Sequence, residues 1–244
     1  MKKQFITLII LATFIPVYSQ DATAILDRVE KNMSSENRVF ESTMIIHGAR
    51  SSRTITSRTY AAGDKKSFTE YLSPAREQGT KMLKLEDQLW IYSPSTDRTI
   101  QISGHMLRQS VMGSDLSYED MMDDRKITDV YDAVISGTEK IDGNDVWILD
   151  LTSKTGDVAY YKRKMWVDKQ KYVPLREELF ARSGQLLKRT TLSEVKQIEG
   201  RWFPTKIVYK DLLKQGDGTE FIISSVRFNQ SIPGYIFTKA ALKQ

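Results

Sequence analysis

The sequence predicts a mainly β protein: one curved antiparallel sheet, left open as half a barrel, with an N-terminal helix and short lid helices. Apolar and polar residues alternate with a period of two in roughly a dozen short runs, as half-buried strands do. Turn residues such as Asp142-Gly143-Asn144 and Ser183-Gly184 separate several of these runs. Parallel strands would need crossover helices between them, and the runs have none, so we expect an antiparallel meander. A sheet this long must curl or close.

The predicted strands form two groups on either side of a polar, helix-prone middle segment. The first group covers residues 39–47, 54–61, 65–72, 80–86, 88–92 and 98–102. The second group covers residues 133–140, 146–153, 159–168, 172–181, 185–197, 201–209 and 219–229.

An amphipathic helix is predicted over residues 21–33, ahead of the first strand. Asp21 suits the N-cap position. The apolar residues that recur at helical spacing are Ala22, Ile25, Leu26, Val29 and Met33. A helix with one apolar face of this kind packs on a sheet.

Residues 1–19 follow the three-part order of a secretory signal peptide. Lys2 and Lys3 are basic, residues 5–17 are apolar, and Val17-Tyr18-Ser19 suits cleavage after Ser19. The apolar run is short for a membrane span, and an uncleaved anchor is the alternative. We therefore expect an exported chain with a single domain over residues 20–244.

The composition argues against an enzyme, a metal site and a nucleic-acid-binding protein. The chain has no cysteine, which excludes disulfides, thiolate metal sites and a lipid-modified cysteine. Its two histidines, His47 and His105, lack a partner at metal-ligand spacing. Nucleophile elbows, phosphate loops and dinucleotide motifs do not occur, so no cofactor is expected. The formal charge of +5 is spread along the chain, which favours an anionic membrane surface over nucleic acid.

Large apolar side chains share faces of several predicted strands, and they are candidates for the lining of a hollow in the curled sheet. The candidates are Trp90 and Tyr92 on one strand, Trp147 and Leu149 on a second, and Met165 on a third. Ordinary core packing is the alternative for each of them.

The middle segment, residues 105–124, is rich in flexible apolar side chains. Gly113-Ser114-Asp115 divides it into two short helical pieces, and Ser117 with Asp120 has the spacing of a capping box. Methionine adapts its shape to irregular partners. The residues that we expect to line a lid are Met106, Leu107, Val111, Met112, Leu116, Met121 and Met122. The alternative is a permanent plug at one end of the sheet.

At this point the chain resembles a known family, the LolA-type periplasmic lipoprotein carriers. The run Leu89-Trp90-Ile91-Tyr92-Ser93-Pro94 after Glu86-Asp87-Gln88 is similar to the family's "DGKxLWFYxP" strand. Tyr71-Leu72-Ser73-Pro74 matches the step before it, and residues 22–33 leading into 39–47 match the family's opening. Residues 232–238 match its "F-x-F-x-x-P" end loosely. Residues 113–121 resemble a divergent branch, the outer-membrane lipoprotein-sorting proteins.

The resemblance implies a fold, a cargo and a location. It implies a half-open sheet closed by lid helices, holding the acyl chains of lipoproteins or other lipids in the periplasm. The implied partners are an inner-membrane transporter and an outer-membrane acceptor. Well-known carriers place an arginine before the proline, where it latches the lid; here Ser73 takes that place, and Arg76 is the candidate substitute.

Two questions stay open in the sequence. A lipid or lipoprotein sensor that signals to a membrane partner would need the same hollow and lid as a carrier. Arg58, Lys84 and Arg163 are all candidates for contact with lipid headgroups, and the sequence does not choose among them.

Overall fold

The computed structural model describes residues 21–48, 51–123 and 125–244. The signal peptide predicted for residues 1–19 lies outside them. Thirteen strands form one antiparallel sheet in the order β6-β5-β4-β3-β2-β1-β13-β12-β11-β10-β9-β8-β7. The two outer strands of this order, β6 and β7, do not pair with each other in the described chain, so the sheet is open. The predicted mainly β meander is confirmed.

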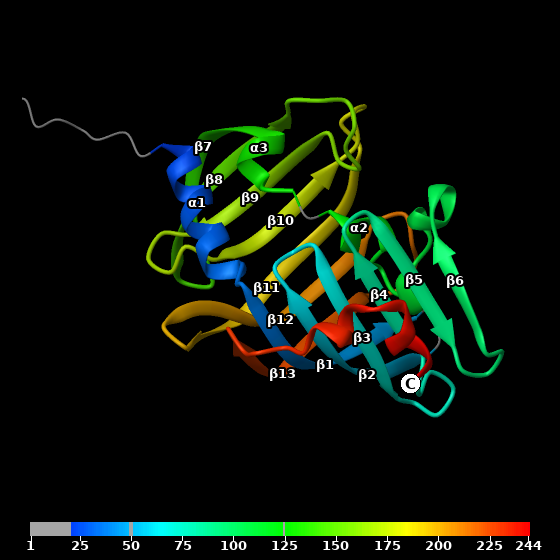
Figure 1. The fold of residues 1–244 in the computed structure, drawn as a ribbon. Coiled ribbons are helices and arrows are strands. Elements are labelled where there is room, and N and C mark those ends of the chain that lie inside the picture. The colour runs from blue at the N-terminus through cyan, green and yellow to red at the C-terminus, as the bar shows by residue number, and fades with distance from the viewer. Residues whose placement is uncertain (1–20, 49–50, 124) are drawn as a thin grey trace, which may run out of the picture.

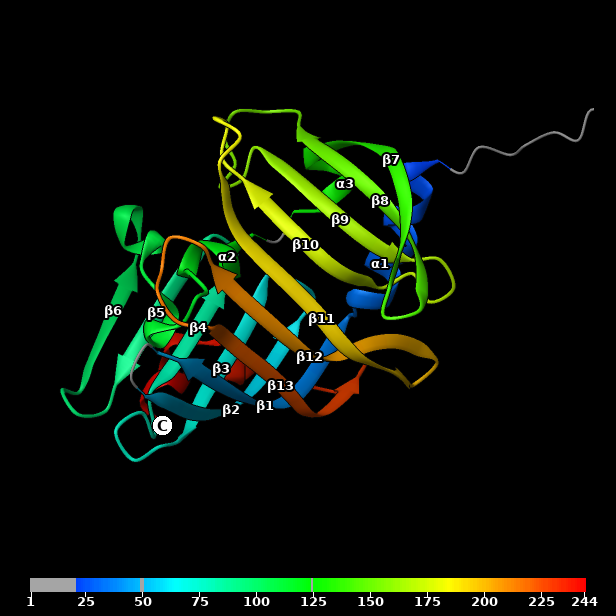
Figure 2. The same cartoon turned by 180° about the vertical axis from the view of Figure 1, so that it is seen from behind.

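The strands closely follow the predicted runs. The first group is β1 (Asn37–His47), β2 (Ser52–Ala62), β3 (Lys66–Ser73), β4 (Lys81–Leu85), β5 (Gln88–Ser93) and β6 (Arg98–Ile102). The second group is β7 (Tyr131–Ile141), β8 (Asn144–Ser153), β9 (Lys162–Asp168), β10 (Pro174–Phe180), β11 (Leu186–Ile198), β12 (Arg201–Asp211) and β13 (Gly218–Phe228). The first strand along the chain, β1, pairs with the last, β13, and this pairing joins the two groups of strands into one sheet. The sheet therefore curves continuously from one group to the other (Figures 1 and 2).

Helices occupy the ends of the chain and the connection between the two strand groups. They are α1 (Ala22–Met33), η1 (Gly104–Arg108), η2 (Val111–Gly113), α2 (Tyr118–Met122), α3 (Ile127–Val130), η3 (Gly234–Phe237) and η4 (Lys239–Lys243). The Asp21 side chain accepts a hydrogen bond from the Thr23 amide at 3.0 Å, which confirms the expected N-cap of α1.

The turn between β12 and β13 shows why glycine is needed where strands reverse. Gly216 and Gly218 have φ angles of +98° and +96°, a region that side chains disfavour. A Cβ atom on Gly216 would lie 2.4 Å from the His47 carbonyl oxygen, and one on Gly218 would lie 2.5 Å from that of Tyr209. The sequence signal at residues 216–218 therefore marks a true reversal.

Different segments cover the two faces of the sheet. α1 packs its buried residues on β8 and β9, next to α3 and β7 (Figure 1). The C-terminal segment, η3 and η4, packs on β3, β4 and β5 with Ala241 and Leu242 buried. The segment from η1 to α2 covers the opposite face of β4–β6. We call the face of the sheet under the segment from η1 to α2 the inner face, and α1 lies on this same face. We call the face under the C-terminal segment the outer face.

Candidate functional site

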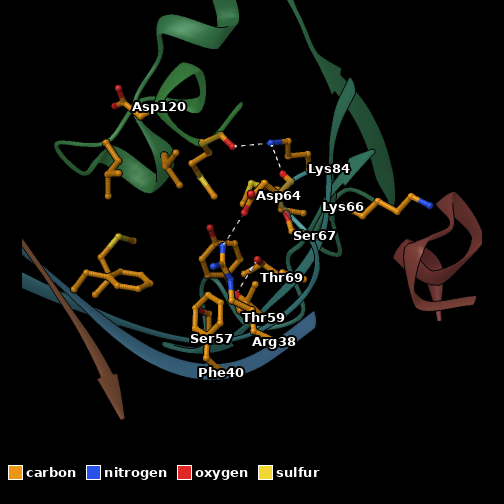
Figure 3. Close-up of a pocket in the computed structure, with 18 of the residues that line it drawn as sticks. Arg38, Phe40, Ser57, Thr59, Asp64, Lys66, Ser67, Thr69, Lys84 and Asp120 are labelled. Carbon is orange, nitrogen blue, oxygen red and sulfur yellow. Dashed lines mark hydrogen bonds and ion pairs between the residues drawn. The ribbon is translucent and has the colours of Figure 1, made fainter. Parts of the chain in front are cut away.

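A cavity of about 280 Å³ lies between the inner face of β1–β4 and the segment from Val111 to Met121 (Figure 3). Its apolar lining is Phe40, Met44, Ile55, Tyr71, Met82, Val111, Leu116, Met121 and Phe221. Pockets that bury small ligands typically measure about 300–1,000 Å³, so the cavity is near the lower end of that range.

The cavity exists because the middle of its floor carries small side chains. Ser57, Thr59 and Ala61 follow one another on the inner face of β2, and Thr69 lies opposite Thr59 on β3. All four are buried. Protein interiors are normally filled to the density of organic crystals, so small residues beneath a covering segment leave space.

The buried hydroxyl groups in the middle of the floor have partners within the sheet. The Thr59 and Thr69 hydroxyls bond each other at 2.9 Å, and those of Ser42 and Ser57 do so at 3.0 Å. Because each of these hydroxyls has a partner in the sheet, an apolar molecule can lie over them without leaving them unsatisfied.

All seven residues predicted to line a lid gather in one cluster over the inner face of β4–β6. Val111 is 4% exposed, and the other six are partly buried against the same strands. Met82, Leu89, Ile91 and Ile102 supply the sheet side of this cluster. The predicted capping box is present, since the Ser117 amide donates to Asp120 at 2.7 Å and the Asp120 amide donates to Ser117 at 3.2 Å. We call residues 104–122 the lid.

Asp115 fastens the elbow of the lid to the base of the β12–β13 turn. Its carboxylate accepts a hydrogen bond from the Thr219 hydroxyl at 2.8 Å and one from the Asp211 amide at 2.9 Å. Its own amide donates to the Thr219 hydroxyl at 3.0 Å. Lys214, from the same turn, donates to the Ser110 hydroxyl and to the Ser114 carbonyl.

Asp120 fastens the start of α2 to β11. It forms a mostly buried ion pair with Lys188 and accepts a hydrogen bond from the Tyr160 hydroxyl. Burial raises the pKa of Asp120, but the charge of Lys188 and the hydrogen bonds from Lys188, Tyr160 and Ser117 outweigh it and hold the pKa below its ordinary value. The carboxylate is therefore ionised at neutral pH, which is the form that binds Lys188.

The arginine that latches the lid in the LolA-type carriers has no equivalent at the corresponding position of this chain. The Ser73 hydroxyl bonds that of Thr56 at 2.6 Å, and the Arg76 side chain is 85% exposed with Glu77 as its ion-pair partner. The proposal that Arg76 substitutes for the latch is wrong. Two cations from β2 and β4 reach the lid: Arg53 lies at the Met112 carbonyl, and Lys84 lies 3.4 Å from the Met121 and Met122 carbonyls.

Trp90 and Tyr92 lie on the outer face, so their predicted place in the hollow is wrong. Trp90 packs with the C-terminal segment, and Lys239 Nζ lies 4.0 Å from the centroid of its ring. Leu89 and Ile91 are the residues of β5 that face the lid. Both faces of β5 are covered, so its sequence is apolar at consecutive positions and alternation does not reveal the inward face.

Trp147, Leu149 and Met165 lie on the inner face, under α1. Trp147 and Leu149 belong to the core beneath α1, with the Tyr172 ring 5.4 Å from that of Trp147. Met165 belongs to the same core and also lines a second cavity of about 370 Å³ beside Val29 and Met33. The structure therefore brings these three residues together, but in the half of the sheet that the helix fills.

The described residues contain no group of three histidine, cysteine, aspartate or glutamate side chains that could hold a metal ion. Among the helices that the structure describes, none has the length and apolar character needed to cross a membrane.

The chain is similar to three solved structures along nearly its whole length. A DUF1329 family protein from Desulfovibrio piger is 27% identical, with a TM-score of 0.81 over 91% of this chain and 98% of its own. A putative outer membrane lipoprotein-sorting protein domain from Vibrio parahaemolyticus is 26% identical, with a TM-score of 0.78 over 92% and 100%. A LolA superfamily protein from Nitrosomonas europaea is 25% identical, with a TM-score of 0.75 over 91% and 100%.

The curated proteins contain no significant match. A family described only as an uncharacterized protein matches residues 63–244, three quarters of the sequence. With the open sheet, the lid and these three structures, the match places the chain in that family, a divergent LolA-like branch of the outer-membrane lipoprotein-sorting proteins.

Proposed function

We propose that this protein is a periplasmic carrier that holds the acyl chains of lipoproteins or other lipids beneath its lid. The observation that carries the proposal is an apolar cavity with a floor of small residues, closed by a methionine-rich segment. Moving an acyl chain out of water gains about 0.8 kcal/mol per methylene group, so such a cavity can hold a lipid in solution. Two of the similar structures, a lipoprotein-sorting protein domain and a LolA superfamily protein, support this cargo class.

The manner in which the lid is held also fits a carrier. Its main anchors are hydrogen bonds and ion pairs at Asp115 and Asp120, and its apolar residues other than Val111 and Tyr118 are only partly buried. Water can replace these hydrogen bonds and ion pairs at a modest cost in free energy. It cannot replace the contacts of a buried apolar core at so small a cost. Loading and release need open and closed states a few kcal/mol apart. We assign no catalytic residue and no cofactor to this carrier. As partners we expect a transporter in the inner membrane and an acceptor in the outer membrane.

The sharpest test fills the cavity and leaves its polar groups otherwise matched. The variant Thr59→Val with Thr69→Phe removes the hydroxyl pair and adds a large side chain; Thr59→Val with Thr69→Val removes the same pair without adding volume. Replacing both partners of a buried hydrogen bond is nearly neutral for stability. Native mass spectrometry of protein purified without detergent should show bound lipid in wild type and in the valine pair. The phenylalanine variant should be empty.

A second variant tests the lid itself. Leu116→Asp with Met112→Asp places one charge in the lining of the cavity and a second against its neighbours Met44 and Ile55, and should abolish lipid binding while the fold survives. Retention of lipid by both the lid variant and the phenylalanine variant would refute the hollow. Transfer of bound lipid to acceptor vesicles supports the carrier, and retention together with a stable membrane partner would point to the sensor instead.

A further inference from the structure

A second cavity, of about 370 Å³, lies beneath α2 next to the 280 Å³ cavity, which we now call the first cavity. The apolar side chains that line the second cavity are Val29, Leu116, Met165, Leu179, Leu192 and Ile207. Val29 belongs to α1, Leu116 to the lid, and the other four to β9, β10, β11 and β12. Both coverings of the inner face, the lid and α1, therefore contribute to this cavity.

Two buried ion pairs also line the second cavity. Arg163 donates to Glu177 at 2.7 Å, and Lys188 pairs with Asp120. The four side chains are 14–16% exposed. Because the charges of each pair neutralise one another, neither pair calls for a charged ligand beside the apolar lining.

The first and second cavities meet at Tyr209 on β12. Leu116, Asp120 and Tyr209 line both of them. Figure 3 shows Asp120 on the lid side of the first cavity, across from Thr59 and Thr69 on its floor. A molecule that lies at Tyr209 can therefore send one branch into each cavity.

The Tyr209 hydroxyl is a hydrogen-bond donor without a partner in the part of the chain that the structure describes. It is not enclosed in the core, since the enclosed side-chain atoms without a partner in that part belong to Ser35, Thr128 and Trp166. The hydroxyl is therefore open to the cavities. Burial and, after it, the negative charge of Asp120 raise the pKa of Tyr209, so the hydroxyl keeps its proton at neutral pH.

A third cavity, of about 720 Å³, adjoins the other two at Asp120 and Tyr209. Its lining is more strongly charged: it includes Glu30 and Lys126, which lie 3.8 Å apart, and Asp123. Charged side chains suit a polar headgroup, whereas an acyl chain would remove them from water. The third cavity is thus the place for the polar part of a ligand whose apolar parts fill the first two.

We propose that the hollow takes a lipid with two ester-linked acyl chains, one in the first cavity and one in the second, with the Tyr209 hydroxyl donating to an ester carbonyl where the chains join. This inference rests on the proposed lipid-carrying function and assigns the second cavity to the second chain. A lipid with one chain leaves one cavity unfilled, and the lining of an unfilled apolar cavity forfeits its packing contacts.

The test compares a two-chain and a one-chain lipid with the same headgroup, dioleoylphosphatidylglycerol and oleoyl-lysophosphatidylglycerol, by native mass spectrometry of the purified protein. Thr190 lies buried on the β11 part of the second cavity. Thr190→Phe fills this cavity and should lower the affinity for the two-chain lipid more than about ten-fold, the effect of two methylene groups left in water. It should leave the one-chain lipid unchanged. Thr190→Val adds no volume, is the matched control, and should change neither.

A measurement on wild type does not depend on the fold of any variant. Phosphatidylglycerol with a photoreactive diazirine at the end of both chains is bound at one molecule per protein and irradiated, and the labelled residues are mapped by peptide mass spectrometry. We expect labels in both cavities, at residues such as Met44 and Met82 in the first and Met165 and Leu192 in the second. Labels confined to one cavity would overturn the inference.

Tyr209→Phe tests the place where the chains join. It should lower the affinity for the ester-linked lipid about five-fold, the effect of one neutral hydrogen bond, and should not change the affinity for an ether-linked analogue that lacks the carbonyl groups. Equal effects on both lipids would show that Tyr209 does not bind an ester and would overturn its assignment.

Two further outcomes separate this inference from the proposed function. Unchanged binding of the two-chain lipid by Thr190→Phe would show that the second cavity holds no chain, and it would leave the carrier intact. Binding of neither lipid by wild type would refute the carrier itself and the inference with it.

Discussion

The inner face of one sheet is packed under a helix at β8 and β9 and hollow under the lid at β1–β4, and the difference lies in what covers it. Over β8 and β9, α1 buries Ala22, Ile25, Leu26 and Val29 almost completely. Over β1–β4, the lid buries few apolar side chains and the floor is made of small residues. The first covering is held by apolar packing, and the second by polar anchors that can be exchanged for water. A single sheet can therefore combine a stable core with a cavity beneath a covering that polar contacts hold in place.

The largest expected difference between the halves is in stability. Leu26 in α1 is fully buried, so Leu26→Ala should lower the free energy of unfolding by about 3 kcal/mol. Leu116 in the lid is partly buried beside a cavity, and Leu116→Ala should cost less than about 1 kcal/mol. Urea unfolding measures both. Equal costs would show that the lid is a permanent plug, part of the core.

The second prediction concerns the anchor at the elbow. Asp115→Ala leaves the Asp211 amide and the Thr219 hydroxyl without their acceptor and should cost about 2 kcal/mol. Amide hydrogen exchange should accelerate across residues 104–122 and stay slow in α1. Asp217→Ala, at an exposed position of the same turn, is the control. Unchanged exchange in the lid would mean that Asp115 does not hold it.

The third prediction uses the lowered pKa of Asp120. A carboxyl group whose pKa is lower in the folded state adds stability above its unfolded pKa, here 3.8, and loses it as the pH falls through the folded value. The stability gap between wild type and Asp120→Asn should thus be constant from about pH 7 to pH 5 and shrink below about pH 4. Denaturant unfolding at several pH values measures it. A gap that grows in acid would contradict the role of Lys188.

Local patterns were enough to predict the sheet. Alternation and turn residues located the strands within a few residues, because both signals act over short distances along the chain. The lid was predictable for the same reason: its methionines and its capping box lie within one short segment. The hydrogen bonds of Asp115 were not predictable, because its partner Thr219 is 104 residues away in the sequence.

The lining of the hollow was only partly predictable. The large aromatic residues of β5 were predicted to line the hollow, but Trp90 and Tyr92 face the C-terminal segment. No local sequence pattern predicts that this segment packs there. The floor of the cavity consists of small side chains, with Ser57, Thr59 and Ala61 at every second position of β2. A period-two series of small residues on one face of a strand, following a large apolar residue on that face, is the signal that could have located it.

The smallest expected effect tests whether the outer face takes any part in lipid binding. Lys239 lies over the Trp90 ring, and such a contact contributes about 0.5–1 kcal/mol at an exposed site. Lys239→Ala should lower the free energy of unfolding by about that amount, Lys239→Arg should not, and neither should change the lipid content seen by native mass spectrometry. The C-terminal segment would then serve to close the outer face of β3–β5. A loss of lipid in Lys239→Ala comparable to that of the cavity-filling variant would instead mean that the outer face contributes to the site, and the contrast between a filled and a hollow half would no longer account for binding.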